Sequence, residues 1–182
     1  PTLPAQRKRL GVMLQEAELP EKLKVGELVH QQAQYFDAPL AVDETLAISG
    51  LTELATRRFD QLSGGQKRRV QFAIALVGNP KLLLIDEPTT GLDVGARRQF
   101  WQVVRELKAR GVSIVLTTHY LEEADALADR IVVIGKGRVL ADGTPAAIKA
   151  RVQGRRVGAR TNLHIEAVRA FAHAGEVTLS EG

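Results

Sequence analysis

Two adjacent carboxylates follow a short apolar run near the middle of the sequence. The run covers residues 82–85, and Asp86 and Glu87 come directly after it. Its length and composition predict a strand that is covered on both faces. Ligands of open α/β sheets bind beyond the carboxyl ends of the strands, so we expect the two carboxylates at a ligand site. Asp86 suits a Mg²⁺ ion held through water beside phosphates, and Glu87 suits a group that positions an attacking water.

A glycine turn at the start of a predicted helix is the second candidate site. Ser63 precedes Gly64 and Gly65, and Gln66 follows them. The backbone N–H groups at a helix start, together with the helix dipole, favour an anion. The Ser63 hydroxyl adds a further donor. An ordinary N-cap uses the same residue types, so this turn alone does not establish a phosphate site.

Three further polar residues stand beside predicted elements. Gln15 follows a predicted strand at residues 10–14, His119 follows one at residues 113–117, and Asp93 precedes a predicted helix. Each of the three is a weak signal alone. Asp93 is a good N-cap, and a single histidine at a strand end is usually structural.

The elements that would position these residues alternate between strands and helices. A hairpin is predicted at residues 130–134 and 138–141, and the predicted helices cover residues 25–36, 42–48, 51–56, 63–77, 94–110, 121–128 and 145–153. This alternation predicts an α/β fold with a parallel sheet. A short β-α-β pattern follows at residues 157–179.

Composition excludes several classes of protein. Of the 182 residues 45% are apolar, and the mean hydropathy is −0.08, which excludes a disordered or collagen-like chain. No apolar run approaches the roughly 18 residues of a membrane helix. The sequence has no cysteine and therefore no disulfide framework or thiolate metal site.

The net charge is +4, and basic residues cluster at 7–9, 67–69, 97–98 and 155–156. We interpret these clusters as solvated faces, with an anionic partner as the alternative. Aromatic residues make up only 4% of the chain, so we expect no nucleic-acid partner.

Together and in this order, the candidate residues resemble the motifs of one family. Gln15 and residues 62–66, 82–87 and 91–93, followed by His119, resemble the Q-loop, signature motif, Walker B motif, D-loop and switch histidine of ABC-transporter ATPases. The resemblance covers about residues 7–153. The finer pattern around Gln15, residues 118–124 and residues 142–145 is similar to bacterial ATPases of drug and antibiotic exporters.

One motif of that family is absent. No G-x-x-x-x-G-K-[ST] occurs in the sequence, and the only Gly-Lys pair is Gly135-Lys136 in the predicted hairpin turn. The family's phosphate loop lies well upstream of its Q-loop. We therefore interpret the sequence as a fragment of a longer protein, with a natural protein lacking its own phosphate loop as the alternative.

The resemblance implies a fold and a domain organisation. We expect a P-loop-NTPase-like ABC ATPase core, mostly a parallel sheet, over residues 1–153 without its N-terminal part. A helical subdomain would be inserted at about residues 20–78. Residues 154–182 would begin a truncated C-terminal β-α-β module.

The resemblance also implies ATP and Mg²⁺ as cofactors. Asp86 and Gln15 would hold Mg²⁺, Glu87 would polarise the attacking water, His119 would contact the γ-phosphate and Gln15 would sense it. The implied nucleotide-binding residues are Ser63, Gly64, Gly65, Gln66 and Asp93.

The implied activity is ATP hydrolysis that powers a separate membrane permease, with export of drugs or other small molecules. The expected partners are a second ATPase subunit, arranged head to tail, and the permease, which we expect to dock on residues 25–59. The expected location is the cytoplasm, peripherally on the inner face of the cell membrane.

Two alternatives stay open. One is a soluble ABC-type ATPase of DNA repair or translation, although the interval between Gln15 and Leu62 has no room for a coiled coil. The other is a catalytically silent partner that supplies only its signature motif.

Overall fold

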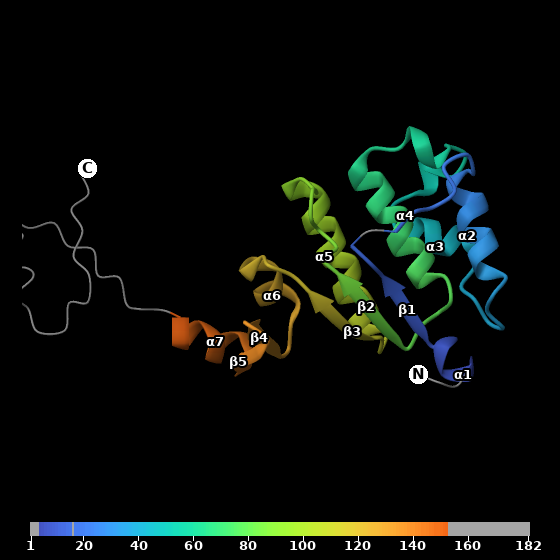
Figure 1. Ribbon diagram of the computed structural model, residues 1–182. Coiled ribbons are helices and arrows are strands. Elements are labelled where there is room, and N and C mark those ends of the chain that lie inside the picture. The colour runs from blue at the N-terminus through green and yellow to red at the C-terminus, as the bar shows by residue number, and fades with distance from the viewer. Residues whose placement is uncertain (1–3, 16, 153–182) are drawn as a thin grey trace, which may run out of the picture. The chain divides into compact units, whose positions relative to one another are not determined.

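The computed structural model describes residues 4–15 and 17–152 (Figure 1). The chain divides into two compact units, Pro1–Pro145 and Ala146–Gly182, and each is considered by itself. In the first unit a parallel sheet contains, in spatial order, β1 (Leu10–Met13), β2 (Leu82–Asp86) and β3 (Ser113–Thr117). The β-α-β pattern predicted at residues 157–179 lies outside the described residues.

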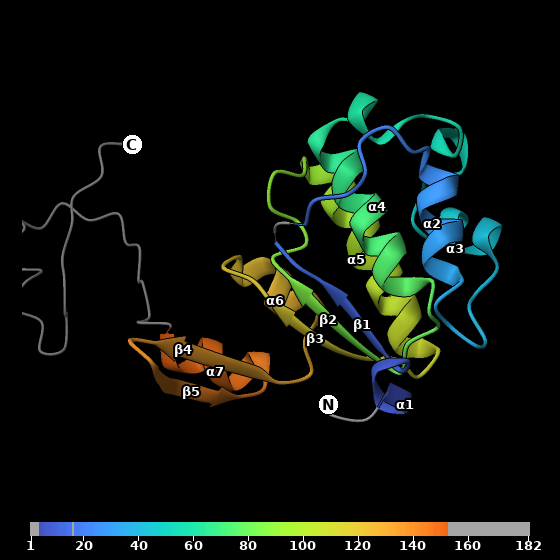
Figure 2. The ribbon, with the colours of Figure 1, turned by 45° about the vertical axis from the view of Figure 1, so that its right-hand side comes forward.

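The register of the sheet brings the carboxyl ends of its strands to one edge. Met13 pairs with Ile85 of β2, and Asp86 pairs with Thr117 of β3. Because all three strands run in the same direction, the loops that follow them leave from the same edge (Figure 2). Gln15, Glu87 and His119 stand at the beginnings of these loops.

One face of the sheet is buried under two helices, α4 (Gly64–Leu76) and α5 (Val94–Ala109). Phe72 of α4 and Phe100 of α5 meet edge to face, with ring centroids 5.1 Å apart. On the opposite face Val12 and Val115 are 44% and 56% exposed. Leu82 of β2 is also 37% exposed, so the prediction that the strand at residues 82–85 is covered on both faces is wrong for the described part of the chain.

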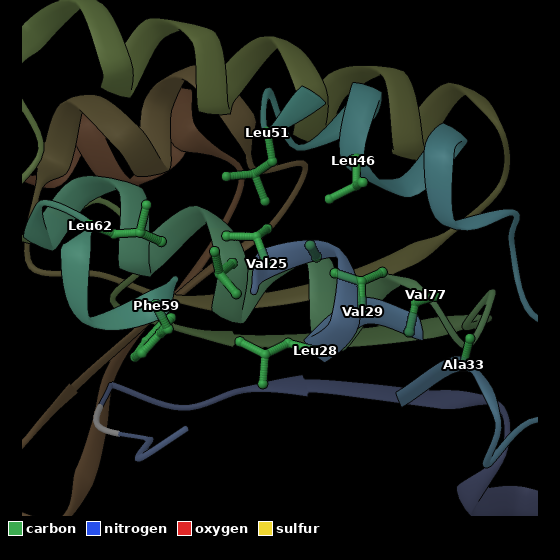
Figure 3. Close-up of a cluster of buried hydrophobic side chains, with 11 residues drawn as sticks. Val25, Leu28, Val29, Ala33, Leu46, Leu51, Phe59, Leu62 and Val77 are labelled. Carbon is green, nitrogen blue, oxygen red and sulfur yellow. The ribbon is translucent and has the colours of Figure 1, made fainter. Parts of the chain in front are cut away.

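A second buried cluster, which we call the helical cluster, lies between α4 and the segment that precedes it (Figure 3). That segment contains α2 (Val25–Ala33), α3 (Val42–Ile48) and two short 3₁₀ helices, η1 (Thr52–Leu54) and η2 (Phe59–Gln61). These elements lie in the predicted helical subdomain, whose boundaries stay a prediction.

Helix α4 belongs to both clusters. Val70 and Ala73 of α4, with Val77 just after it, lie in the helical cluster, whereas Phe72 and Leu76 face the sheet. A helix that is apolar on opposite sides must be buried on both, so α4 is fixed between two cores. Its contact with β1 is close, since a Cβ atom on Gly11 would lie 2.2 Å from the carbonyl oxygen of Ala75.

The helical elements differ from the prediction at several ends. The helix predicted at residues 51–56 is only the 3₁₀ turn η1, because the carbonyls of Ala55 and Arg57 accept hydrogen bonds from Gly26 and Val25 at the start of α2. Helix α2 ends at Ala33 instead of residue 36, and the 3₁₀ helix η2 and the short helix α1 (Pro4–Arg7) were not part of the prediction.

The remaining elements follow the predicted order. Helix α6 (Leu121–Leu127) precedes the antiparallel hairpin of β4 (Ile131–Gly135) and β5 (Arg138–Gly143). Lys136 and Gly137 form its turn with positive φ angles of 49° and 71°, as a tight hairpin requires. Helix α7 (Pro145–Val152) begins with proline at its first position. None of the described helices has both the length and the apolar character needed to cross a bilayer.

Candidate functional site

Glu87 has an unusual backbone conformation at the end of β2. Its φ angle is +44°, in the left-handed region that residues other than glycine rarely adopt. Its N–H group is held by Thr117, whose carbonyl oxygen lies 3.1 Å away and whose hydroxyl oxygen lies 3.2 Å away. The same hydroxyl donates to the carboxylate of Asp86. Strained conformations of this kind cluster at functional sites, so Glu87 is the leading candidate for a functional group.

Three side chains converge on the Glu87 carboxylate. His119 Nδ1 lies 3.2 Å from Oε1, the Thr90 hydroxyl donates to Oε2 over 3.2 Å, and Gln15 Nε2 lies 3.4 Å from Oε2. The structure thus brings together Gln15, Glu87 and His119, which stand far apart in the sequence. The Glu87 and His119 side chains remain 28% and 55% exposed, so a ligand can reach them.

Aromatic and cationic contacts orient His119 from its other side. Its ring stacks at a tilt on Tyr120, with centroids 4.1 Å apart, and the guanidinium carbon of Arg97 lies 4.4 Å from the Tyr120 ring centroid. A carboxylate that is oriented by hydrogen bonds and open to solvent can accept a proton from water or align it for attack.

The residues predicted to hold Mg²⁺ offer oxygen ligands. Asp86 presents a carboxylate and Gln15 an amide oxygen at the same sheet edge, and both ligand types suit this hard cation. Within residues 4–15 and 17–152 no group of three or more His, Cys, Asp or Glu side chains could enclose a metal. The arrangement fits an ion that keeps several waters and phosphate oxygens, which is the usual coordination of Mg²⁺.

The glycine turn forms the N-terminus of α4 with a reciprocal cap. The Ser63 hydroxyl accepts from the Gln66 N–H over 3.3 Å, and Gln66 Oε1 accepts from the Ser63 N–H over 3.0 Å. The first N–H groups of a helix have no intrahelical partner, which leaves those of Gly64 and Gly65 for an anion. A Cβ atom on Gly64 would meet nothing within 4 Å, so the fold does not require glycine there.

The turn and the Glu87 cluster are separate groups in this chain. Among the described residues no hydrogen bond joins residues 63–66 of the turn to Glu87 or His119, whereas Arg68, two residues further along α4, donates to the Glu87 carbonyl over 2.8 Å. Asp93 caps α5 by accepting from the Ala96 N–H over 2.8 Å. Its role in nucleotide binding stays a prediction.

Sequence reasoning missed three residues at the site. Thr90 and Thr117 each bond Glu87, and only their positions beside the end of a strand could have suggested them. Arg68 was grouped with the solvated basic clusters, yet it is only 9% exposed. Burial lowers the pKa of its guanidinium, and the charges of Asp86 and Glu87 oppose that shift.

Comparisons with known proteins point to one family. A family model described as "ABC transporter" matches residues 1–90. The daunorubicin resistance ATP-binding protein DrrA3 of Streptomyces coeruleorubidus is 42% identical over 160 residues, which are 84% of this chain and 50% of that protein. The Nod factor export ATP-binding protein I of Rhizobium sp. (strain N33) is 42% identical over 147 residues, which are 78% of this chain and 48% of that protein.

A solved structure shows the same architecture. It is described as a metal-chelate type ABC transporter in an inward-facing conformation, and it shares 26% identity with this chain at a TM-score of 0.66. The match covers 76% of this chain and 59% of the solved one. The chain spans about half the length of the two relatives. The fold, the order of the motifs and these relatives together place the chain in the family of ABC-transporter ATP-binding proteins.

Proposed function

We propose that this chain serves in the binding and hydrolysis of ATP to power a separate membrane permease, with export of drugs or other small molecules. The convergence of Gln15, Thr90 and His119 on the Glu87 carboxylate is the observation that carries the proposal. The names of the two relatives, which refer to daunorubicin resistance and to Nod factor export, support export as the direction.

Each side chain of the Glu87 cluster has a separate task in this proposal. Bound Mg-ATP supplies a γ-phosphoryl group that water can attack. Glu87 orients that water and accepts its proton, while Thr90 and His119 hold the carboxylate in place. Asp86, fixed by the Thr117 hydroxyl, holds the metal together with Gln15. His119 also contacts the γ-phosphate, and Gln15 senses it.

The glycine turn serves a second ATPase subunit. Ser63, Gly64, Gly65 and Gln66 bind the nucleotide held by a partner arranged head to tail, with the N–H groups of Gly64 and Gly65, which have no intrahelical partner, directed to its phosphate. The open space around Gly64 supports this role, since a phosphate can approach the backbone closely there. Asp93, at the start of α5, completes this set of residues.

Residues 25–59 provide the docking surface for the permease on the cytoplasmic side of the membrane. Tyr35 is 68% exposed and is the apolar side chain best placed for this contact. Phe36 and Leu40, which the sequence also suggests, are partly buried. Leu40 packs against the buried residues between the sheet and helices α4 and α5. We therefore centre the docking surface on Tyr35.

Cross-linking in membranes tests the coupling to a permease. Single cysteines at Tyr35 and along residues 25–59 are paired with cysteines in the cytoplasmic loops of the permease encoded nearby; cysteines on α5 serve as controls. The proposal predicts cross-links from the Tyr35 region only. Cross-links from α5 alone would show that the docking surface is not at residues 25–59. If no permease copurifies with the chain, a soluble ATPase would be favoured.

A further inference from the structure

Arg68 joins the ends of two strands from the buried side of α4. Its Nη1 donates to the carbonyl oxygens of Leu14 and Gln15 over 2.7 and 2.8 Å, and its Nη2 donates to those of Asp86 and Glu87 over 2.6 and 2.8 Å. Two of these carbonyls belong to the residue pair at the end of β2, and two to the residues that follow β1. One guanidinium therefore holds four backbone carbonyls.

A second side chain of α4 extends this connection. Gln71 accepts from Arg68 Nη1 over 2.9 Å, and its own Nε2 donates to the Ala17 carbonyl over 3.1 Å. The backbone is thus held on both sides of residue 16. Arg68 is the centre of a bonded group that reaches the loop after β1 at three residues.

Arg68 binds carbonyls that lie just beyond the last paired residues of β1 and β2. The pairing of β1 with β2 stops at Met13 and Ile85. Beyond that pair Arg68 bonds to the backbone of both chain segments, and the Gln15 side chain also reaches the Glu87 carboxylate. Those segments carry Gln15 and Glu87, and the helix that carries Arg68 begins at the glycine turn. A displacement of Gln15, of Glu87 or of the glycine turn must therefore strain the bonds of Arg68.

We propose that Arg68 is a positioning residue of the ATPase site, which fixes Glu87 relative to Gln15 and couples both to the helix that begins at Ser63. The inference rests on the proposed function. The planar fork of arginine serves the two pairs of carbonyls at once, whereas a lysine ammonium is a compact point charge that cannot span them. Misplacement of a catalytic group by about 1 Å can cost 10²-fold in rate.

The bonds of Arg68 also act on the backbone of Glu87. That residue has a positive φ angle, and its carbonyl and N–H groups are held by Arg68 and Thr117 respectively. Bonds on both sides of the strained residue keep its carboxylate aimed at the ligand. Loss of Arg68 should therefore lower the rate of the chemical step more than the affinity for nucleotide.

The test uses this chain preceded by the N-terminal segment of an ABC-transporter ATPase, including its phosphate loop; we call this protein the completed cassette. Arg68→Lys and Arg68→Ala are compared with Arg69→Lys, the matched control. Arg69 is the next residue of the same helix and makes a single bond of 3.3 Å to the Gly50 carbonyl. The readouts are kcat and KM for ATP, the folded fraction, and ¹³C shifts of the carbonyls of Gln15 and Glu87.

We expect Arg68→Lys to lower kcat by about 10- to 100-fold with KM changed by less than about threefold, and to shift both carbonyl resonances. Guanidinium ion at millimolar concentration should restore part of the activity of Arg68→Ala, and ammonium should not. Arg69→Lys should keep its activity.

Two results would overturn the inference. One is unimpaired kcat in a folded Arg68→Lys protein. The other is a loss of activity that follows the folded fraction and is equal in Arg69→Lys. If Arg68→Ala unfolds, Arg68→Lys decides, because it keeps the buried charge. A folded wild-type cassette without any turnover would instead contradict the proposed function, and the inference with it.

Discussion

At the scale of single residues, Glu87 combines a strained backbone with a well-supported carboxylate. Its φ angle of +44° lies in a region that residues other than glycine rarely adopt. Thr117 and Arg68 bond to its backbone, and three further side chains bond to its carboxylate, those of Thr90, Gln15 and His119. We propose the water-orienting role for Glu87 rather than for Asp86 because Gln15, Thr90 and His119 all bond to the Glu87 carboxylate.

Substitution of Glu87 by glutamine tests that assignment. In the completed cassette Glu87→Gln should keep ATP binding and lower hydrolysis by about 10²- to 10⁴-fold, because an amide of the same shape cannot accept a proton. Phosphate release and nucleotide binding are measured on the same preparation, with the exposed Glu53→Gln as control. Near-normal turnover would mean that another group activates the water.

Substitution of Gly64 separates ligand contact from folding. A side chain at this position has open space, so Gly64→Val should change the free energy of unfolding by no more than about 0.5 kcal/mol. It should nevertheless abolish hydrolysis in the dimer, since it blocks the approach of phosphate to the backbone. Urea unfolding and ATPase assays check both parts. An unfolded variant would show that the glycine serves the turn itself.

The sequence was sufficient to predict the candidate residues that directly follow a strand. Gln15, Glu87 and His119 follow three predicted strands, and a parallel sheet necessarily brings such positions together. Arg68 could not be predicted in the same way. Its partners are backbone carbonyls that lie 53 and 54 residues upstream and 18 and 19 downstream, and carbonyls leave no trace in residue types.

At the scale of elements, the placement of α4 decides where the glycine turn and Arg68 lie. The helix has apolar residues on two sides and packs between the helical cluster and the sheet. Its N-terminus lies at the same end of the unit as the carboxyl ends of β1 and β2 (Figure 2). A shift of α4 should therefore reach both groups of candidate residues.

A methyl group at Gly11 should push α4 away from β1. The new Cβ atom would lie 2.2 Å from a backbone oxygen of α4, a contact that neither element can relieve by a side-chain rotation. Gly11→Ala should lower the free energy of unfolding by about 1–3 kcal/mol, the usual cost of overpacking. Urea denaturation measures this cost. The neighbouring Val12→Ala, whose side chain is 44% exposed, is the control. Equal stability of the wild-type and Gly11→Ala proteins would contradict the close packing.

Long periodic helices were easier to predict than short turns. Helix α5 and the sheet strands agree with the sequence because their apolar spacing spans several turns or a whole strand. The η1 turn was mistaken for a longer helix, since the carbonyls of Ala55 and Arg57, just after it, bond to residues about 30 positions upstream, at the start of α2. Local propensity contains no information about such a bond.

At the scale of the whole molecule, the chain carries the residues that we propose for water activation and for a partner's nucleotide, whereas its sequence contains no phosphate-loop motif. The family's phosphate loop supplies a lysine and a cradle of backbone N–H groups for the β- and γ-phosphates. The chain spans about half the length of its relatives. Because the sequence contains no such loop motif, we expect ATP turnover to depend on a phosphate loop supplied to this chain.

The most direct test of this account is the steady-state ATPase activity of the 182-residue chain and of the completed cassette, measured side by side as phosphate release with Mg-ATP. The account predicts no turnover by the chain alone and clear turnover by the completed cassette, abolished again by Glu87→Gln. Turnover by the pure chain would contradict it, because the phosphates would then be held by residues other than the missing loop. A folded completed cassette that binds ATP without hydrolysing it would contradict the role of the Glu87 cluster.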